Sequence, residues 1–178
     1  MRPRSPQQDR SLRLLTAGII LVLSVIPFIG LDPYTVNYTG LFQQRPLLTW
    51  LCMGPALILQ GWLFMTAVTK TAGVSSLRVP SLVLLIGVIV LMIMPYRKEH
   101  DLTTNLHLVL AFIVLVLLNG IIFRMLFFRQ KLLLFYAGGC MLAFFTALTA
   151  SSINGLSELV YAAVLTITLY QAGQRHMR

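Results

Sequence analysis

Six acidic and histidine side chains could do chemistry in this sequence beyond Asp9 and His176 at its ends, and three serines lie close to one of them. Carboxylates and imidazoles together bind divalent metal ions, or act as general acid and base toward a lipid headgroup. A membrane hydrolase would need such groups at the depth of the headgroups. The six are Asp32, Glu99, His100, Asp101, His107 and Glu158, and the three serines are Ser151, Ser152 and Ser157.

The spacing of these groups matches no established ligand motif. His100 and His107 are seven residues apart, and neither HxxxH nor HExxH occurs. A solvated Glu99-His100-Asp101 loop, with His107 hydrogen-bonded at the start of a helix, explains the same residues. We therefore predict no metal ion, and we keep a ligand-binding or catalytic site as the alternative to this loop.

The residues required for several other kinds of membrane-protein site or enzyme are absent from the sequence. A membrane haem protein commonly needs two axial histidines within its spans, and only His107 comes near one, so we predict no cofactor. The chain has no phosphate-binding glycine loop, no CxxC pair and no nucleophile elbow. Cys52 and Cys140 both lie in apolar segments, which favours two buried thiols that act as small apolar side chains.

Gln60 and Asn119 are the most polar side chains deep within the apolar segments. A side-chain amide that faces lipid costs several kcal/mol, so both should face other helices. We expect them at similar depth, because each lies about 14 residues into its own segment. They form either a polar patch along a cavity or interhelical hydrogen bonds worth about 1 kcal/mol each.

A stripe of small residues recurs every fourth position near the end of the chain. Such a stripe lets a second helix approach closely, either within this chain or on a partner subunit. Its members are Gly139, Ala143, Ala147 and Ser151.

The composition places all these residues in a membrane protein. Of 178 residues, 57% are hydrophobic and 11% are charged, whereas a soluble domain carries about 25% charged residues. A chain of this length cannot hide so much apolar surface from water, because its surface-to-volume ratio is too high. The net charge of +9 does not indicate a nucleic-acid partner, since the basic residues cluster at the ends of apolar segments.

Six segments approach the roughly 20 apolar residues that a helix needs to cross a bilayer. We predict an all-α, polytopic bundle of six transmembrane helices, preceded by a basic segment at 1–13 and followed by a basic tail at 172–178. The sixth segment is the weakest, because it is short and carries Glu158 near its start, so a five-span arrangement is the alternative. The predicted spans are 14–31, 47–68, 79–96, 105–126, 132–150 and 155–171.

The positive-inside rule favours an orientation with both chain ends in the cytoplasm. In that orientation eleven of the 14 basic residues lie inside, and only Arg45, Arg97 and Lys98 lie outside. A bacterial inner membrane is the simplest location, with an endomembrane as the alternative. The eleven inside residues are Arg2, Arg4, Arg10, Arg13, Lys70, Arg78, Arg124, Arg129, Lys131, Arg175 and Arg178.

Two short stretches carry a resemblance to a known family. The first is Pro33-Tyr34-Thr35-Val36-Asn37-Tyr38-Thr39-Gly40, which leads to Pro46, and the second is His107 with Ala111 and Phe112. Together with the six-span layout, they resemble the damage-regulated autophagy modulator (DRAM) superfamily and its uncharacterised bacterial relatives. The resemblance implies a membrane protein without an established reaction, in a group of which some members are linked to lipid organisation or membrane trafficking.

The sequence favours a non-enzymatic integral membrane protein that organises lipids or supports a membrane complex. Its expected partners are membrane lipids and either another membrane protein or a second copy of the chain. The predicted orientation places the six histidine and carboxylate residues named above at the outer membrane boundary. A lipid-active enzyme or small-solute carrier that uses these outer-face residues is the alternative.

Overall fold

The computed structural model describes residues 5–71, 75–94, 102–150 and 152–174, and these residues are almost entirely helical, with no strand among them. Six long helices and one short helix follow one another, with two 3-10 turns, η1 and η2. The helices are α1 (Pro6–Val25), α2 (Tyr38–Gln44), α3 (Pro46–Lys70), α4 (Arg78–Ile93), α5 (Leu102–Leu126), α6 (Gln130–Thr149) and α7 (Gly155–Ala172), and the turns are η1 (Ile26–Phe28) and η2 (Ser75–Leu77).

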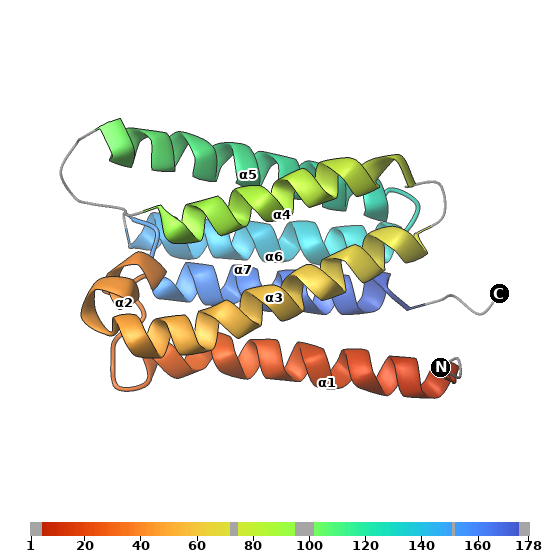
Figure 1. Cartoon of the computed structure of the whole chain (residues 1–178), viewed down its shortest axis with the longest axis horizontal. Coiled ribbons are helices and arrows are strands. Elements are labelled where there is room, and N and C mark those ends of the chain that lie inside the picture. The colour runs from red at the N-terminus through yellow and green to blue at the C-terminus, as the bar shows by residue number, and fades with distance from the viewer. Residues whose placement is uncertain (1–4, 72–74, 95–101, 151, 175–178) are drawn as a thin grey trace.

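The six long helices run side by side and alternate in direction along the chain (Figure 1). We call the end of the bundle that holds the start of α1 and the end of α7 the N/C end. The opposite end, which holds α2 and the start of α7, is the loop end. Because consecutive helices alternate, α3 and α5 also finish at the N/C end, next to the starts of α4 and α6.

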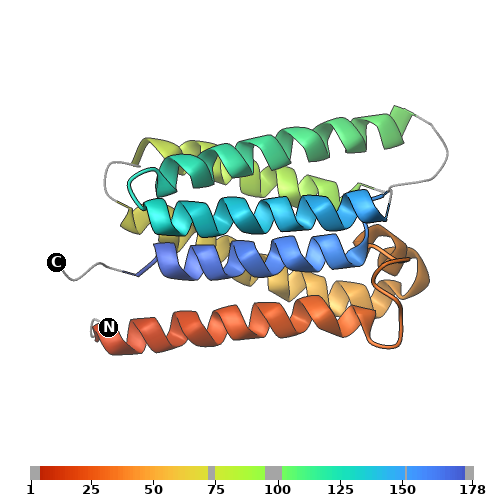
Figure 2. The ribbon, with the colours of Figure 1, turned by 180° about the vertical axis from the view of Figure 1, so that it is seen from behind.

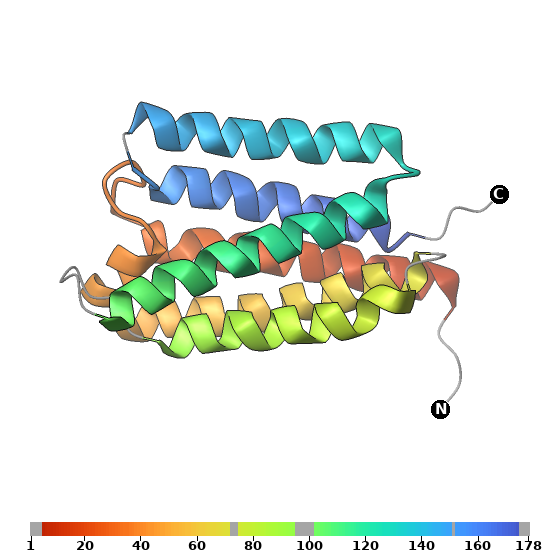
Figure 3. The ribbon, with the colours of Figure 1, turned by 90° about the horizontal axis from the view of Figure 1, so that it is seen from above.

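Helix α7 is the central element, since it packs against α6, α1 and α3. Figure 2 shows α7 between α6 and α1. Helices α4 and α5 pack on each other, and α5 runs obliquely to α6 (Figure 3). The buried side chains of α7 include Leu165, Thr166, Leu169 and Ala172. Its weak hydropathy fits this position, because neighbouring helices shield much of its surface from lipid.

The outer surface of the bundle is apolar. Ile58 of α3, Phe112 of α5 and Leu134 of α6 are 75%, 67% and 72% exposed, respectively, although leucine, isoleucine and phenylalanine are normally buried in water-soluble proteins. Within the described residues, four helical segments are long and apolar enough to cross a membrane: Gln7–Phe28, Pro46–Lys70, Leu102–Leu126 and Gln130–Thr149. These apolar helices indicate an integral membrane protein.

The two remaining long helices are shorter or less apolar than these four. Helix α4 has 16 residues and α7 has 18, so they extend about 24 and 27 Å at about 1.5 Å per residue. Both lengths approach the roughly 30 Å of a hydrocarbon core. Both helices lie alongside the four candidate spans (Figure 1).

Local sequence signals explain where several helices begin. Ser5 and Gln8 form a capping box at the start of α1, with Pro6 at its first position. Helix α1 therefore begins before the predicted span, and 6–13 of the predicted basic segment are helical. Pro46 occupies the first position of α3, as Pro6 does in α1, although α3 has no side-chain cap. The short helix α2 lies in a stretch for which the sequence predicted only a loop.

Candidate functional site

A cluster of hydrogen-bonded polar groups joins three helices inside the bundle. Its members are Asn119 of α5, Tyr136 and Cys140 of α6, and Tyr161 of α7. The Tyr136 hydroxyl donates to Asn119 Oδ1 at 2.9 Å, and the Asn119 Nδ2 group donates to the Tyr161 hydroxyl at 3.3 Å. The two phenol oxygens are 3.2 Å apart, and Cys140 Sγ lies 4.0 Å from Asn119 Oδ1. We call these four residues the amide–phenol cluster.

The amide–phenol cluster satisfies its own hydrogen-bonding groups. Asn119 Nδ2 also donates to the carbonyl of Leu115 in the preceding turn, at 2.8 Å, so both ends of the amide have partners. Tyr136 is fully buried, and an unpaired hydroxyl at such a position would cost several kcal/mol in an apolar medium. The cluster therefore stabilises the association of α5, α6 and α7, and it contains no carboxylate or imidazole that could transfer a proton.

Gln60 bonds to a different residue of the central helix. The Thr166 hydroxyl of α7 lies 2.9 Å from Gln60 Oε1 and 2.7 Å from the Ala162 carbonyl, and its one proton serves these two acceptors. Gln60 thereby joins α3 to α7. The two amides that the sequence analysis selected, Gln60 and Asn119, thus each find partners on α7.

At the loop end, Glu158 binds the first turn of α2. Glu158 Oε2 accepts a hydrogen bond from the backbone N–H of Tyr38 at 2.7 Å. The N–H groups of Gly155 and Leu156 donate to the carbonyls of Val36 and Pro33, at 2.9 and 3.0 Å. Residues 33–38 are therefore docked on the first turn of α7, about 120 residues later in the chain.

The same contact requires a glycine at position 155. A β-carbon there would lie 2.2 Å from the Phe28 ring and 2.5 Å from the Val36 carbonyl oxygen. The Phe28 and Tyr38 rings pack edge to face, with centroids 5.1 Å apart. The Tyr38 hydroxyl donates to the Ser24 carbonyl at 3.1 Å, and burial raises the pKa of this phenol above its ordinary value. Glu158 thus belongs to a closely packed contact between α7 and the 33–38 segment.

Of the other members of the outer histidine and carboxylate set, the structure describes only Asp32 and His107. Asp32 is exposed and accepts from the Tyr34 N–H at 2.9 Å within its own turn. His107 is half-buried on α5. Residues Glu99, His100 and Asp101, like Ser151, lie outside the described residues.

Two serines near Glu158 have different surroundings. Ser157 is buried and completes a capping box with Asn154 at the start of α7, whereas Ser152 is exposed. Among the residues that the structure describes, no group of three histidine, cysteine, aspartate or glutamate side chains could hold a metal ion.

Gly139, in the small-residue stripe, lies against α7. A β-carbon at Gly139 would stand 2.4 Å from a methyl carbon of Val164, and Ala143, one turn later, is buried. Helices α6 and α7 pack along their length, so the stripe supports contact within the chain, as expected of small residues between membrane helices.

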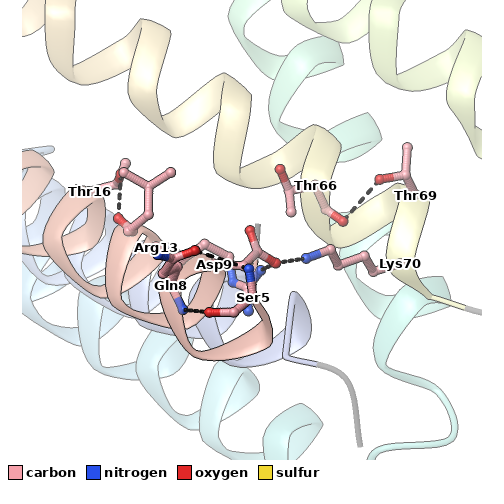
Figure 4. A network of polar contacts seen from close by, with 9 residues as sticks. Ser5, Gln8, Asp9, Arg13, Thr16, Thr66, Thr69 and Lys70 are labelled. Carbon is pink, nitrogen blue, oxygen red and sulfur yellow. Dashed lines mark hydrogen bonds and ion pairs between the residues drawn. The ribbon is translucent and has the colours of Figure 1, made fainter. Parts of the chain in front are cut away.

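Asp9 bridges two helices at the N/C end. Its Oδ2 atom accepts from Arg13 Nη1 on α1 and from Lys70 Nζ at the end of α3 (Figure 4). Arg13 is only 3% exposed, so the nearby carboxylate offsets part of the cost of burying its charge. The sequence analysis missed this site. Its one local signal was the four-residue spacing from Asp9 to Arg13, which places both on one helix face.

Arg129, also at the N/C end, binds backbone carbonyls at the end of α7. Its Nη1 atom donates to the carbonyl of Ala172 at 2.8 Å and lies 3.5 Å from that of Gln171. These carbonyls belong to the last turn of α7, where a helix lacks internal donors and where a positive charge is favourable. Burial lowers the pKa of Arg129 from its ordinary value, and the guanidinium connects the α5–α6 turn to the end of α7.

Comparisons of the chain with protein-family models, with curated proteins and with solved structures find no match.

Proposed function

We propose that this protein is a non-enzymatic integral membrane protein that organises lipids or supports a membrane complex. It crosses the membrane six times, with both chain ends in the cytoplasm. The observation that carries this proposal is that both amides deep in the bundle, Asn119 and Gln60, bond to side chains of neighbouring helices. The amide–phenol cluster and the Gln60–Thr166 pair use their hydrogen bonds to join helices, as structural polar groups do.

The distribution of basic residues supports the orientation. Of the eight lysines and arginines in the described part of the chain, seven lie at the N/C end and only Arg45 lies at the loop end. The positive-inside rule then assigns the N/C end to the cytoplasm. A bacterial inner membrane is the location that we propose, and the likeness to the DRAM superfamily is part of the same proposal.

The alternative is a lipid-active enzyme or small-solute carrier that uses the outer-face residues. Glu158 bears on this alternative, because its carboxylate binds the backbone of α2. In a structural role, Glu158→Gln keeps an acceptor oxygen and preserves the protein. In a catalytic or metal-binding role, Glu158→Gln removes a required charge and His107→Gln removes a required imidazole. Each variant would then abolish the enzymatic or transport activity.

Extraction of the protein together with its surrounding lipids tests the proposed function. The full chain is taken from expressing cells with a styrene–maleic acid copolymer, and the lipids in the discs are measured by mass spectrometry. We expect one lipid class to be enriched over the bulk membrane, equally in the wild type, Glu158→Gln and His107→Gln. An unrelated six-span protein, extracted in the same way, is the control.

Two results of the extraction would contradict the proposal. A disc composition equal to that of the bulk membrane, without a reproducible partner subunit, would exclude both lipid organisation and support of a complex. An enrichment lost in either outer-face variant would favour the alternative instead.

A further inference from the structure

A cavity opens at the N/C end between α3, α5, α6 and α7. Its volume is about 1020 Å³, at the upper limit of small-molecule and cofactor sites, which occupy roughly 300–1,000 Å³. The cavity lies beside the α5–α6 turn and the last turn of α7. It is thus at the depth where, in the proposed orientation, the cytoplasmic headgroups of the bilayer begin.

Three cationic side chains line this cavity, and none of its described lining residues is acidic. They are Lys70 at the end of α3, Arg129 in the α5–α6 turn and Lys131 at the start of α6. We call the space they line the cationic cavity. Asp9 offsets part of the charge on Lys70, but Lys131 is exposed and no hydrogen bond or ion pair within the described residues involves its side chain.

The fixed position of Arg129 makes the cavity more than a loose group of surface charges. Its Nη1 atom is held by the Ala172 carbonyl at 2.8 Å, which leaves the other guanidinium N–H groups as donors. The residue is also the N-cap of α6, and its side chain makes no capping hydrogen bond to that helix. The first N–H groups of any helix lack partners within that helix. Those of α6 also receive no cap from the Arg129 side chain, and a helix start of this kind favours an anion.

Apolar side chains line much of the remaining wall, together with the polar Thr71, Gln130 and Gln171. Ile167 of α7 and Phe135 of α6 lie one turn or more nearer the middle of the bundle than the cations do, and Phe128 stands in the α5–α6 turn. Phe128 is 87% exposed. A ligand that fits this wall has an anionic group beside the lysines and arginine and an apolar part directed along α6 and α7 toward the hydrocarbon.

We propose that the cationic cavity binds the phosphate group of an anionic phospholipid. The proposal deepens the function proposed above and rests on it, because it identifies which lipid chemistry the protein would select and where. Basic pockets between membrane helices on the cytoplasmic side recognise anionic headgroups through charge, and each lysine or arginine near the surface contributes about 1 kcal/mol. Free phosphate shares this chemistry but lacks the acyl chains that would contact Phe135 and Ile167.

The test uses the full chain, purified in a non-ionic detergent, with phosphatidylglycerol and phosphatidylcholine as probes. Native mass spectrometry measures how much of each lipid stays bound as its concentration is raised. We expect tighter retention of phosphatidylglycerol, weakened about fivefold by Lys131→Gln and more than tenfold by Lys70→Gln/Lys131→Gln, since about 1 kcal/mol per charge corresponds to about fivefold in affinity.

Arg124→Gln is the matched control. Arg124 is an exposed arginine of α5 at the same end of the bundle, and it does not line the cavity. Its substitution removes the same unit charge and should leave the retention of phosphatidylglycerol within twofold of the wild type. If Arg124→Gln weakens retention as much as Lys131→Gln does, binding follows net charge alone and the proposed site is wrong.

Two further results would overturn the proposal without any variant. Equal retention of the two lipids by the wild type would show that the cavity does not select an anion. Displacement of phosphatidylglycerol by inorganic phosphate at equal concentration would show that the ligand is a soluble anion.

The binding test in detergent and the extraction from cells can contradict their two proposals separately. Loss of selective binding in detergent leaves lipid organisation by other surfaces open. A cellular disc composition equal to that of the bulk membrane leaves the cavity chemistry intact.

Discussion

Gly139 of α6 lies so close to Val164 of α7 that a β-carbon at position 139 would stand 2.4 Å from a valine methyl carbon. Real β-carbons do not approach other heavy atoms to this distance, so the two helices can pack this closely only if residue 139 is a glycine. The contact lies midway along both helices, and α7 is the helix on which α1, α3 and α6 pack.

We therefore expect Gly139→Ala to destabilise the folded protein by about 1–3 kcal/mol, the usual cost of overpacking. Unfolding in mixed micelles, followed by circular dichroism, measures the change. Gly138→Ala is the matched control, because a β-carbon at Gly138 meets nothing within 4 Å. The double variant Gly139→Ala/Val164→Ala should recover part of the loss, and equal stability of the two single glycine variants would refute the close contact.

Replacement of Tyr136 by phenylalanine should loosen the amide–phenol cluster. The change removes the hydroxyl that donates to Asn119 and lies next to the Tyr161 hydroxyl. We expect a loss of about 1–2 kcal/mol, as measured for hydrogen bonds between membrane helices in model systems. Tyr170→Phe provides the comparison, since the Tyr170 hydroxyl makes no hydrogen bond within the described part of the chain, and it should change stability much less.

Glu158→Ala should release the segment before α3 from α7. The N–H of Tyr38 would lose its acceptor, and an unsatisfied buried donor costs about 1–3 kcal/mol. Hydrogen exchange at residues 33–45 should become faster, while exchange in α5 stays unchanged. Glu158→Gln retains an acceptor oxygen and should preserve most of the protection, so equal acceleration in both variants would argue against a hydrogen-bonding role.

Asp9→Asn tests the bridge between α1 and α3. The substitution leaves the buried Arg13 without a charged partner and removes the ion pair with Lys70. Because Asp9 is itself partly exposed, we expect a loss of about 1–2 kcal/mol, less than the 3–5 kcal/mol typical of a fully buried pair. Thermal unfolding in detergent measures it, and Asp32→Asn, in an exposed turn, should have little effect.

Cysteine labelling tests the proposed orientation. In a Cys52→Ala/Cys140→Ala background, single cysteines replace three exposed residues: Thr35 and Ser152 at the loop end, and Gln130 at the N/C end. A membrane-impermeant maleimide applied to intact cells should label positions 35 and 152, and should label position 130 only after permeabilisation. The reverse pattern would place both chain ends outside the cell, and the cationic cavity would then open on the outer side of the membrane.

The sequence by itself determined the class of the protein and much of its segmentation. Long apolar runs are local properties, so they predicted helices and lipid-facing surfaces without knowledge of contacts. The capping residues Ser5 and Asn154, and the proline at position 46, are local signals of the same kind. Gln60 and Asn119 stood out for a similar reason, since an amide inside an apolar run must find a partner.

Only the tertiary structure decided which groups meet. Thr166 bonds to Gln60 across 106 residues, and Glu158 reaches the N–H of Tyr38 across 120, distances over which periodicity carries no information. In the sequence, the weak hydropathy of α7 made it the least certain of the predicted spans. In the fold, α1, α3 and α6 pack against this helix. The cationic cavity likewise exists only because packing brings the ends of α3, α5 and α7 to the start of α6, where charges far apart in the chain share one space.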